Sequence, residues 1–88
     1  MKILAHPIDI IAVFKEAGRH PIPYRFKYTD TDGDICDVVI GKIISVDEKR
    51  MAGARTYNYL CQSEINGVER QYVLKYNIQE CKWQLYKI

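Results

Sequence analysis

The fold is decided by residues 56–88, TYNYLCQSEINGVERQYVLKYNIQECKWQLYKI, in which apolar and polar side chains alternate on both sides of a turn signal. Alternation with a period of two is typical of β-strands that bury one face. Asn66-Gly67 is a strong hairpin signal, because both central residues of a type I′ turn need a positive φ. The stretch therefore predicts antiparallel strands at 56–65 and 68–78 with a fixed register.

Counting outward from this turn pairs the core-facing residues of the two strands. The predicted pairs are Ile65 with Val68, Cys61 with Tyr72, Tyr59 with Leu74 and Tyr57 with Tyr76. A second turn at Gln79-Glu80 adds a strand at 81–88. The two registers agree, and they predict a core face with the rows Tyr57-Tyr76-Trp83 and Tyr59-Leu74-Leu85.

The opposite face of these three strands is the first candidate for function. The same counting gives it an apolar row of Leu60, Val73 and Tyr86. The bordering residues are Asn58, Lys75 and Gln84 on one side, and Gln62, Gln71 and Ile88 on the other. Two interpretations stay open: an apolar N-terminal helix lies across the row, or the row is a patch that binds a partner.

The beginning of the chain predicts that helix. Residues 7–17 place Ile10, Ile11 and Phe14 on one side, and Gly18 stands where such a helix ends. A helix with so wide an apolar face must lie against the rest of the protein.

Two more strands are predicted at 24–28 and 35–46, joined at Asp32-Gly33. A two-residue turn there pairs Phe26 with Val39 and Tyr24 with Gly41, and Gly41 marks a bend in the second strand. Which face of 35–46 points inward stays open. The mixed-charge run 47–55 predicts an exposed loop.

Together these patterns predict one mainly β (α+β) domain over 1–88, with a helix at 7–17 followed by a five-stranded antiparallel meander over 24–88. The arrangement resembles a small SH3-like or partly open barrel, and a resemblance of architecture alone carries no function. No apolar run has the length of a membrane span, no signal peptide is convincing, and the cysteine count is odd. We therefore expect a cytoplasmic protein without a membrane partner.

The sequence offers little for metal binding or catalysis. The acids of 30–34 have the spacing of the first calcium-loop ligands, but Ile35 and Gly41 stand where such a loop needs glycine and glutamate. No Cys-x-x-Cys pair and no Gly-x-Ser-x-Gly elbow occurs. We expect a solvated acidic hairpin tip, no metal, no cofactor and no enzymatic activity. The cysteines are expected to be small buried hydrophobes: Cys36, Cys61 and Cys81.

The function expected from the sequence is binding of a protein partner, or of a second copy, through a sheet face or an unpaired strand edge. The expected residues of that patch are Leu60, Val73, Tyr86, Asn58, Lys75 and Gln84. The alternative is a single-stranded nucleic acid, bound by an aromatic ring beside basic side chains. Its expected residues are Arg25, Lys27, Lys75, Lys82 and Tyr86. A net charge of +2 is far below the strongly basic footprint usual for that class.

Overall fold

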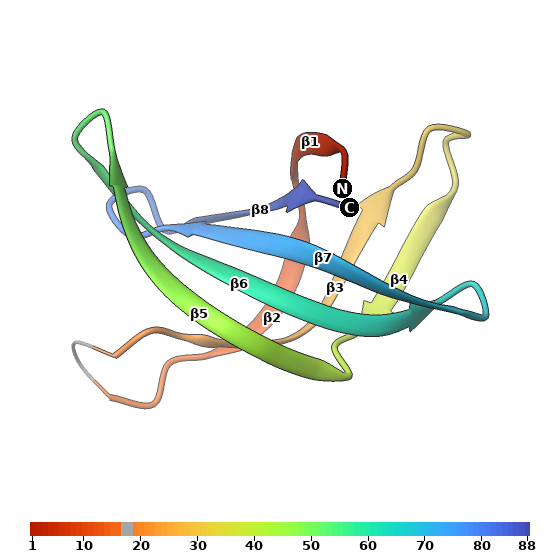
Figure 1. Cartoon of the computed structure of the whole chain (residues 1–88), viewed down its shortest axis with the longest axis horizontal. Helices are drawn as coiled ribbons and strands as arrows, with labels where there is room; N and C mark the ends of the chain where they lie inside the picture. The colour runs from red at the N-terminus through yellow and green to blue at the C-terminus, as the bar shows by residue number, and fades with distance from the viewer. Residues whose placement is uncertain (17–18) are drawn as a thin grey trace.

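Eight strands form two antiparallel sheets with one core between them (Figure 1). The computed structural model of the chain describes residues 1–16 and 19–88. The strands are β1 (Ile3–Pro7), β2 (Asp9–Val13), β3 (Ile22–Thr29), β4 (Ile35–Val39), β5 (Lys42–Met51), β6 (Ala54–Ile65), β7 (Val68–Asn77) and β8 (Lys82–Lys87). A five-stranded sheet has the order β1-β8-β7-β6-β5, and a three-stranded sheet has the order β2-β3-β4.

The predicted helix at 7–17 is wrong, because the described part of this segment is mostly strand; its predicted end at 17–18 lies outside the described residues. Burial alternates along the segment. Half-buried Ile8, Ile10 and Ala12 alternate with exposed Asp9, Ile11 and Val13. Isoleucine and valine lose side-chain freedom in a helix and fit a pleated surface well, so the segment pairs with β3 instead.

The predicted core face of the last three strands is confirmed except beside the turn, where Val68 is 58% exposed. β6 and β7 pair Tyr57 with Tyr76 and Tyr59 with Leu74. Asn66 and Gly67 have φ values of 52° and 79°, as a type I′ turn requires. β7 and β8 pair Tyr76 with Trp83 and Leu74 with Leu85, again as predicted.

The turn between β7 and β8 is longer than the predicted Gln79-Glu80 pair and covers residues 78–81. The side chain of Asn77 stabilises it, since its Oδ1 accepts the N–H groups of Gln79 at 3.1 Å and Glu80 at 3.0 Å. Cys81 closes the turn with a φ of 56°. The predicted register is unchanged. The longer turn takes up only the one residue pair next to it and leaves Asn77 opposite Lys82.

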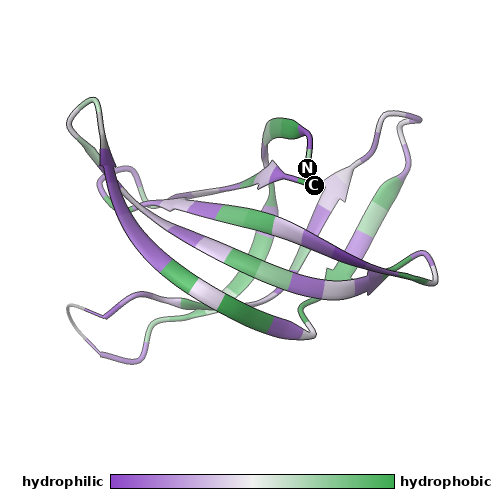
Figure 2. Cartoon of the chain, viewed as in Figure 1, coloured by the Kyte–Doolittle hydropathy of each residue, from purple (hydrophilic) through white to green (hydrophobic). Residues whose placement is uncertain are grey.

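Aromatic side chains from both sheets build the core. Tyr59, Tyr72 and Leu74 of the five-stranded sheet are fully buried, and so are Phe26 and Val38 of the three-stranded sheet. The rings of Phe26 and Tyr72 meet across the gap between the sheets with centroids 5.4 Å apart. Figure 2 shows the resulting bands of apolar and polar residues along β5, β6 and β7.

The β3–β4 hairpin differs by one residue from the predicted register, since Phe26 lies opposite Val38 and not Val39. Gly33 donates its N–H to the Asp30 carbonyl at 3.1 Å and has a φ of 85°. A turn followed by such a left-handed glycine adds a residue to the loop and shifts the ladder. The open question of facing is thereby answered: Val38 is buried, whereas Val39 is 63% exposed.

The predicted strand 35–46 divides at Gly41, where the chain leaves β4 and enters β5 in the other sheet. The predicted bend is thus confirmed. The loop predicted at 47–55 is wrong: β5 continues to Met51, and Ala52 and Gly53, with φ values of 50° and 82°, turn the chain directly into β6. Within the described residues no strand ladder joins the two sheets, so the barrel is not closed. No helix in this part of the chain is long and apolar enough to cross a membrane.

Candidate binding face of the five-stranded sheet

The outer face of the five-stranded sheet carries most of the predicted patch. Leu60 lies opposite Val73, and Lys75 lies between Asn58 and Gln84, as predicted. β5 extends this face beyond the prediction. Its contribution was missed because the run 47–55 was expected to be a loop: Ser45 lies opposite Leu60, and Asp47 lies opposite Asn58.

A β-bulge in β8 moves Tyr86 from its predicted position. Val73 lies opposite Lys87 instead, because the β7–β8 register shifts between Val73 and Leu74. The extra residue leaves both Tyr86 and Lys87 beside the outer-face depression described below. Ile88 packs against the core, so its predicted place on the outer face is wrong.

Two lysines surround the ring of Tyr86. The Lys75 Nζ lies 3.7 Å from the ring centroid, and the Lys87 Nζ lies 5.3 Å from it. Both distances are within the range of a cation–π interaction, which holds an ammonium group over an aromatic face. Lys75 therefore covers part of the ring that the nucleic-acid alternative needs for stacking, and positive charge is concentrated at this end of the sheet. The bulge that brings Lys87 here has no signal in the sequence.

A shallow depression of about 260 Å³ lies on this face. Half-buried Leu60 and Val73 form apolar parts of its lining. Its charged residues are three lysines and one aspartate: Lys49, Lys75, Lys87 and Asp47. All lining residues belong to β5–β8. The N-terminal helix that was expected as a possible cover of this face is not formed by the described residues. The face is thus a basic rim around an apolar floor.

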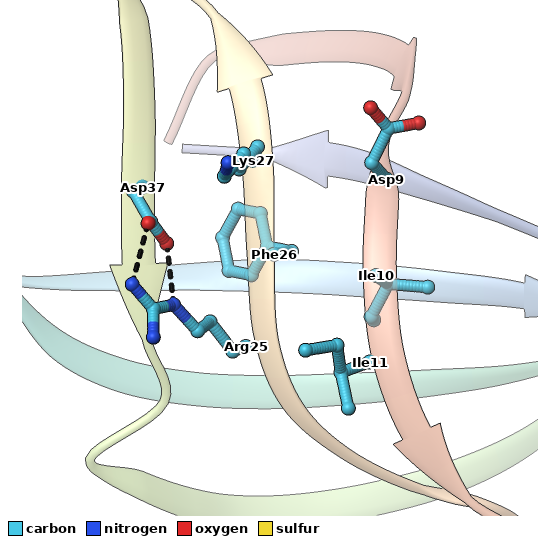
Figure 3. A pocket seen from close by; sticks show the side chains of 7 residues that line it. All are labelled: Asp9, Ile10, Ile11, Arg25, Phe26, Lys27 and Asp37. Atoms are coloured by element: carbon cyan, nitrogen blue, oxygen red, sulfur yellow. Dashed lines mark hydrogen bonds and ion pairs between the residues drawn. The ribbon is translucent and has the colours of Figure 1, made fainter.

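The residues of the nucleic-acid alternative do not form one site. Arg25 and Lys27 lie on the three-stranded sheet, beside a depression of about 480 Å³ (Figure 3). The Arg25 guanidinium donates to both carboxylate oxygens of Asp37, at 2.8 and 2.6 Å, and these hydrogen bonds hold the pKa of Asp37 below its usual range. Lys27 lies between Asp9 and Asp37 in the ladder, so acids already surround these two basic residues. Lys75, Tyr86 and Lys82 lie on β7 and β8 of the other sheet.

The acidic tip between β3 and β4 brings the carboxylates of Asp30, Asp32 and Asp34 within 4.8 Å of one another. The Asp30 carboxylate has a structural role, because its Oδ1 accepts the N–H groups of both Asp32 and Asp34 at 2.9 Å. As the sequence predicts, these acids form a hairpin tip, in which Asp32 and Asp34 are exposed.

The three cysteines are free thiols in different surroundings. Cys61 is fully buried, as predicted, and burial raises the pKa of its thiol to about 12, so the thiol stays protonated at neutral pH. Cys36 is half-buried and Cys81 is exposed, so the prediction of a buried hydrophobe is wrong for Cys81. The longer turn at 78–81 explains the difference, because it places Cys81 outside the ladder.

Comparison of the chain with protein-family models, with curated proteins and with solved structures finds no match. The fold and the face together define a small domain of two antiparallel sheets, one of which presents an apolar floor with a basic rim.

Proposed function

We propose that this chain is a small, non-enzymatic interaction domain of the cytoplasm, which binds a protein partner through the outer face of its five-stranded sheet. The observation that carries the proposal is the depression over Leu60 and Val73, with its apolar floor and its three lysines. The partner that suits it is an extended segment in which apolar side chains alternate with acidic ones. Apolar side chains of this segment cover the floor, while its carboxylates lie beside the lysines.

Two observations favour a protein partner over the nucleic acid. The Lys75 ammonium already lies over the Tyr86 ring, where a base would stack. Arg25 and Lys27, expected to hold phosphates, lie on the other sheet among Asp9 and Asp37. A non-enzymatic role accords with the surroundings of the buried serine, because the Ser63 hydroxyl is hydrogen-bonded to the Tyr72 hydroxyl. The cytoplasmic placement is supported by the three free thiols.

The proposal is tested with a fluorescent peptide that alternates glutamate with leucine, and with single-stranded oligothymidylate as the competing probe. We expect the peptide to bind, and Val73→Glu and Lys75→Glu each to weaken binding at least about tenfold by placing a carboxylate against the acidic segment. Because no helix formed by residues 1–16 or 19–88 covers Val73, Val73→Glu should lower the free energy of unfolding by less than about 1 kcal/mol.

Matched controls are Ile11→Glu, an exposed apolar residue of the three-stranded sheet, and Lys15→Glu, which makes the same charge change away from the depression. Both should leave the affinity nearly unchanged. Equal losses in the controls and in the face variants would show that only net charge matters. Tight oligothymidylate binding that falls steeply between about 50 and 200 mM salt would favour the nucleic acid instead.

A further inference from the structure

β4 is an edge strand that lacks the features protecting the other sheet edges. Each of the other three edge strands, β1, β2 and β5, has a register shift in its ladder. Such bulges, together with charged side chains and prolines, keep an edge from pairing with another strand. The β3–β4 ladder is regular throughout, and Ile35–Val39 contains a single charged residue, Asp37.

The open edge of β4 offers backbone hydrogen-bonding groups at alternate residues. The N–H of Ile40 donates to the carbonyl of Tyr24, and the N–H of Asp30 donates to the carbonyl of Asp34, each at 2.9 Å. Bonded and non-bonded pairs alternate along an antiparallel ladder. The N–H and C=O groups that point away from β3 therefore belong to Ile35, Asp37 and Val39. The side chains of Ile35 and Val39 are 72% and 63% exposed.

A depression of about 510 Å³ lies beside this edge, between β4 and the end of the β6–β7 hairpin. Its charged residues are three carboxylates and one ammonium: Asp37, Glu64, Glu69 and Lys42. Glu64 lies directly opposite Glu69 in the β6–β7 ladder, an arrangement in which like charges repel. Among the ion pairs of residues 1–16 and 19–88, none includes Glu64 or Glu69. This depression therefore favours a positively charged occupant.

We propose that β4 accepts an extended, basic segment of a partner protein as a fourth strand of the three-stranded sheet. Backbone hydrogen bonds to Ile35, Asp37 and Val39 give affinity, and lysine or arginine side chains beside Glu64 and Glu69 give specificity. A second copy of this chain fits less well. Symmetric antiparallel pairing about Asp37 would place the two Asp37 side chains opposite each other and bring both acidic depressions together. β4 lies in the other sheet from the face of the proposed function, and the two depressions share no residue, so this proposal stands independently of that one.

The test uses three short peptides: one alternating lysine and valine, one with glutamate in place of lysine, and the lysine peptide N-methylated along one backbone edge. Affinity is measured by fluorescence anisotropy, and the site is mapped by amide chemical shifts. We expect the lysine peptide to shift the amides of 35–39, and the N-methylated peptide to bind there at least about tenfold more weakly. The glutamate peptide should leave the amides of 35–39 unshifted, even where it binds the outer face of the five-stranded sheet. Glu64→Gln combined with Glu69→Gln should weaken the lysine peptide several-fold.

A matched pair of variants tests the backbone contact on the protein side. Val39→Pro removes the N–H at the open edge and keeps the ladder to β3, and it should weaken binding at least about tenfold. Val39→Ala keeps the N–H and should stay within about threefold. Equal shifts of the amides of 35–39 by the lysine and glutamate peptides, unchanged binding of the N-methylated peptide, or shifts confined to β5 would overturn the proposal. So would a peptide-free dimer that Val39→Pro dissociates, since the occupant would then be a second copy.

Discussion

The hydroxyl oxygens of Ser63 and Tyr72 lie 2.6 Å apart on the inner face of the β6–β7 pair, and both residues are buried. Ser63 Oγ also accepts the N–H of Gly41 at 3.1 Å. Gly41 is the residue at which the chain passes from one sheet to the other. One serine thus connects this crossing point to the aromatic core.

Replacing the two hydroxyls should have unequal effects. Tyr72→Phe removes one hydrogen bond and leaves Ser63 with Gly41 as partner, so we expect a loss of about 1 kcal/mol. Ser63→Ala leaves both the Tyr72 hydroxyl and the Gly41 N–H without this partner, and should cost about 2–3 kcal/mol. Urea unfolding of the two variants and of the double variant measures the coupling. Equal losses from the two single variants would contradict this account.

Gly41→Ala should destabilise the protein. A Cβ at this position would lie 3.1 Å from the backbone carbonyl oxygen of Gln62, which cannot move without disturbing β6. We expect a loss of about 1–2 kcal/mol in thermal or chemical unfolding. Replacing an uncrowded glycine by alanine raises the free energy of unfolding by about 0.4–1 kcal/mol instead, so the sign of the change alone tests this prediction.

Deletion of residues 81–88 should abolish cooperative folding. The deletion removes Leu85, which is fully buried, and leaves β1 without its partner strand. Leu85→Ala should retain the fold but lower the free energy of unfolding by about 2–5 kcal/mol. Tyr86→Ala, which truncates the next side chain on the outer face, is the control and should cost clearly less. A cooperative thermal transition in the truncated chain would refute the assigned core.

Stability should fall at alkaline pH. Burial raises the pKa of Cys61 from its ordinary 9.0 to about 12, and burial also raises the pKa of Tyr59 and Tyr72 above their ordinary 10.0. Between these pKa values the unfolded chain has lost protons that the folded chain keeps, so each unit of rise in pH lowers the free energy of unfolding. The contribution is complete below about pH 9 and is lost progressively toward pH 12.

Urea unfolding at a series of pH values measures this slope. Cys61→Ala should flatten the dependence just above pH 9, where the thiol titrates before the tyrosines. A stability that stays constant from neutral pH to pH 11 would show that these groups reach water in the folded state.

The C-terminal half of the fold was predictable because its signals are local and agree with one another. Asn66-Gly67 permits few turns, and the alternation from Tyr57 to Leu85 leaves a single register that buries the aromatic side chains. The predicted row of Leu60 and Val73 followed from the same counting.

The remaining features depend on contacts that local patterns do not encode. The pattern of residues 8–13 fits both a helix and a strand. The segment becomes a strand because it pairs with β3, and the pattern of 8–13 alone does not encode this pairing. The β3–β4 register depends on the left-handed Gly33, which changes loop length by one residue. The bulge that places Lys87 opposite Val73 has no signal in the local sequence pattern.

The pairing of β1 with β8 also constrains the order of folding. β1 and β8 are far apart in the sequence, so the five-stranded sheet cannot be completed before β8 has been synthesised. Such contacts between distant segments slow folding, because the loss of chain entropy precedes the gain from contacts. During synthesis the earlier strands therefore expose apolar surface until β8 is available to pair with β1.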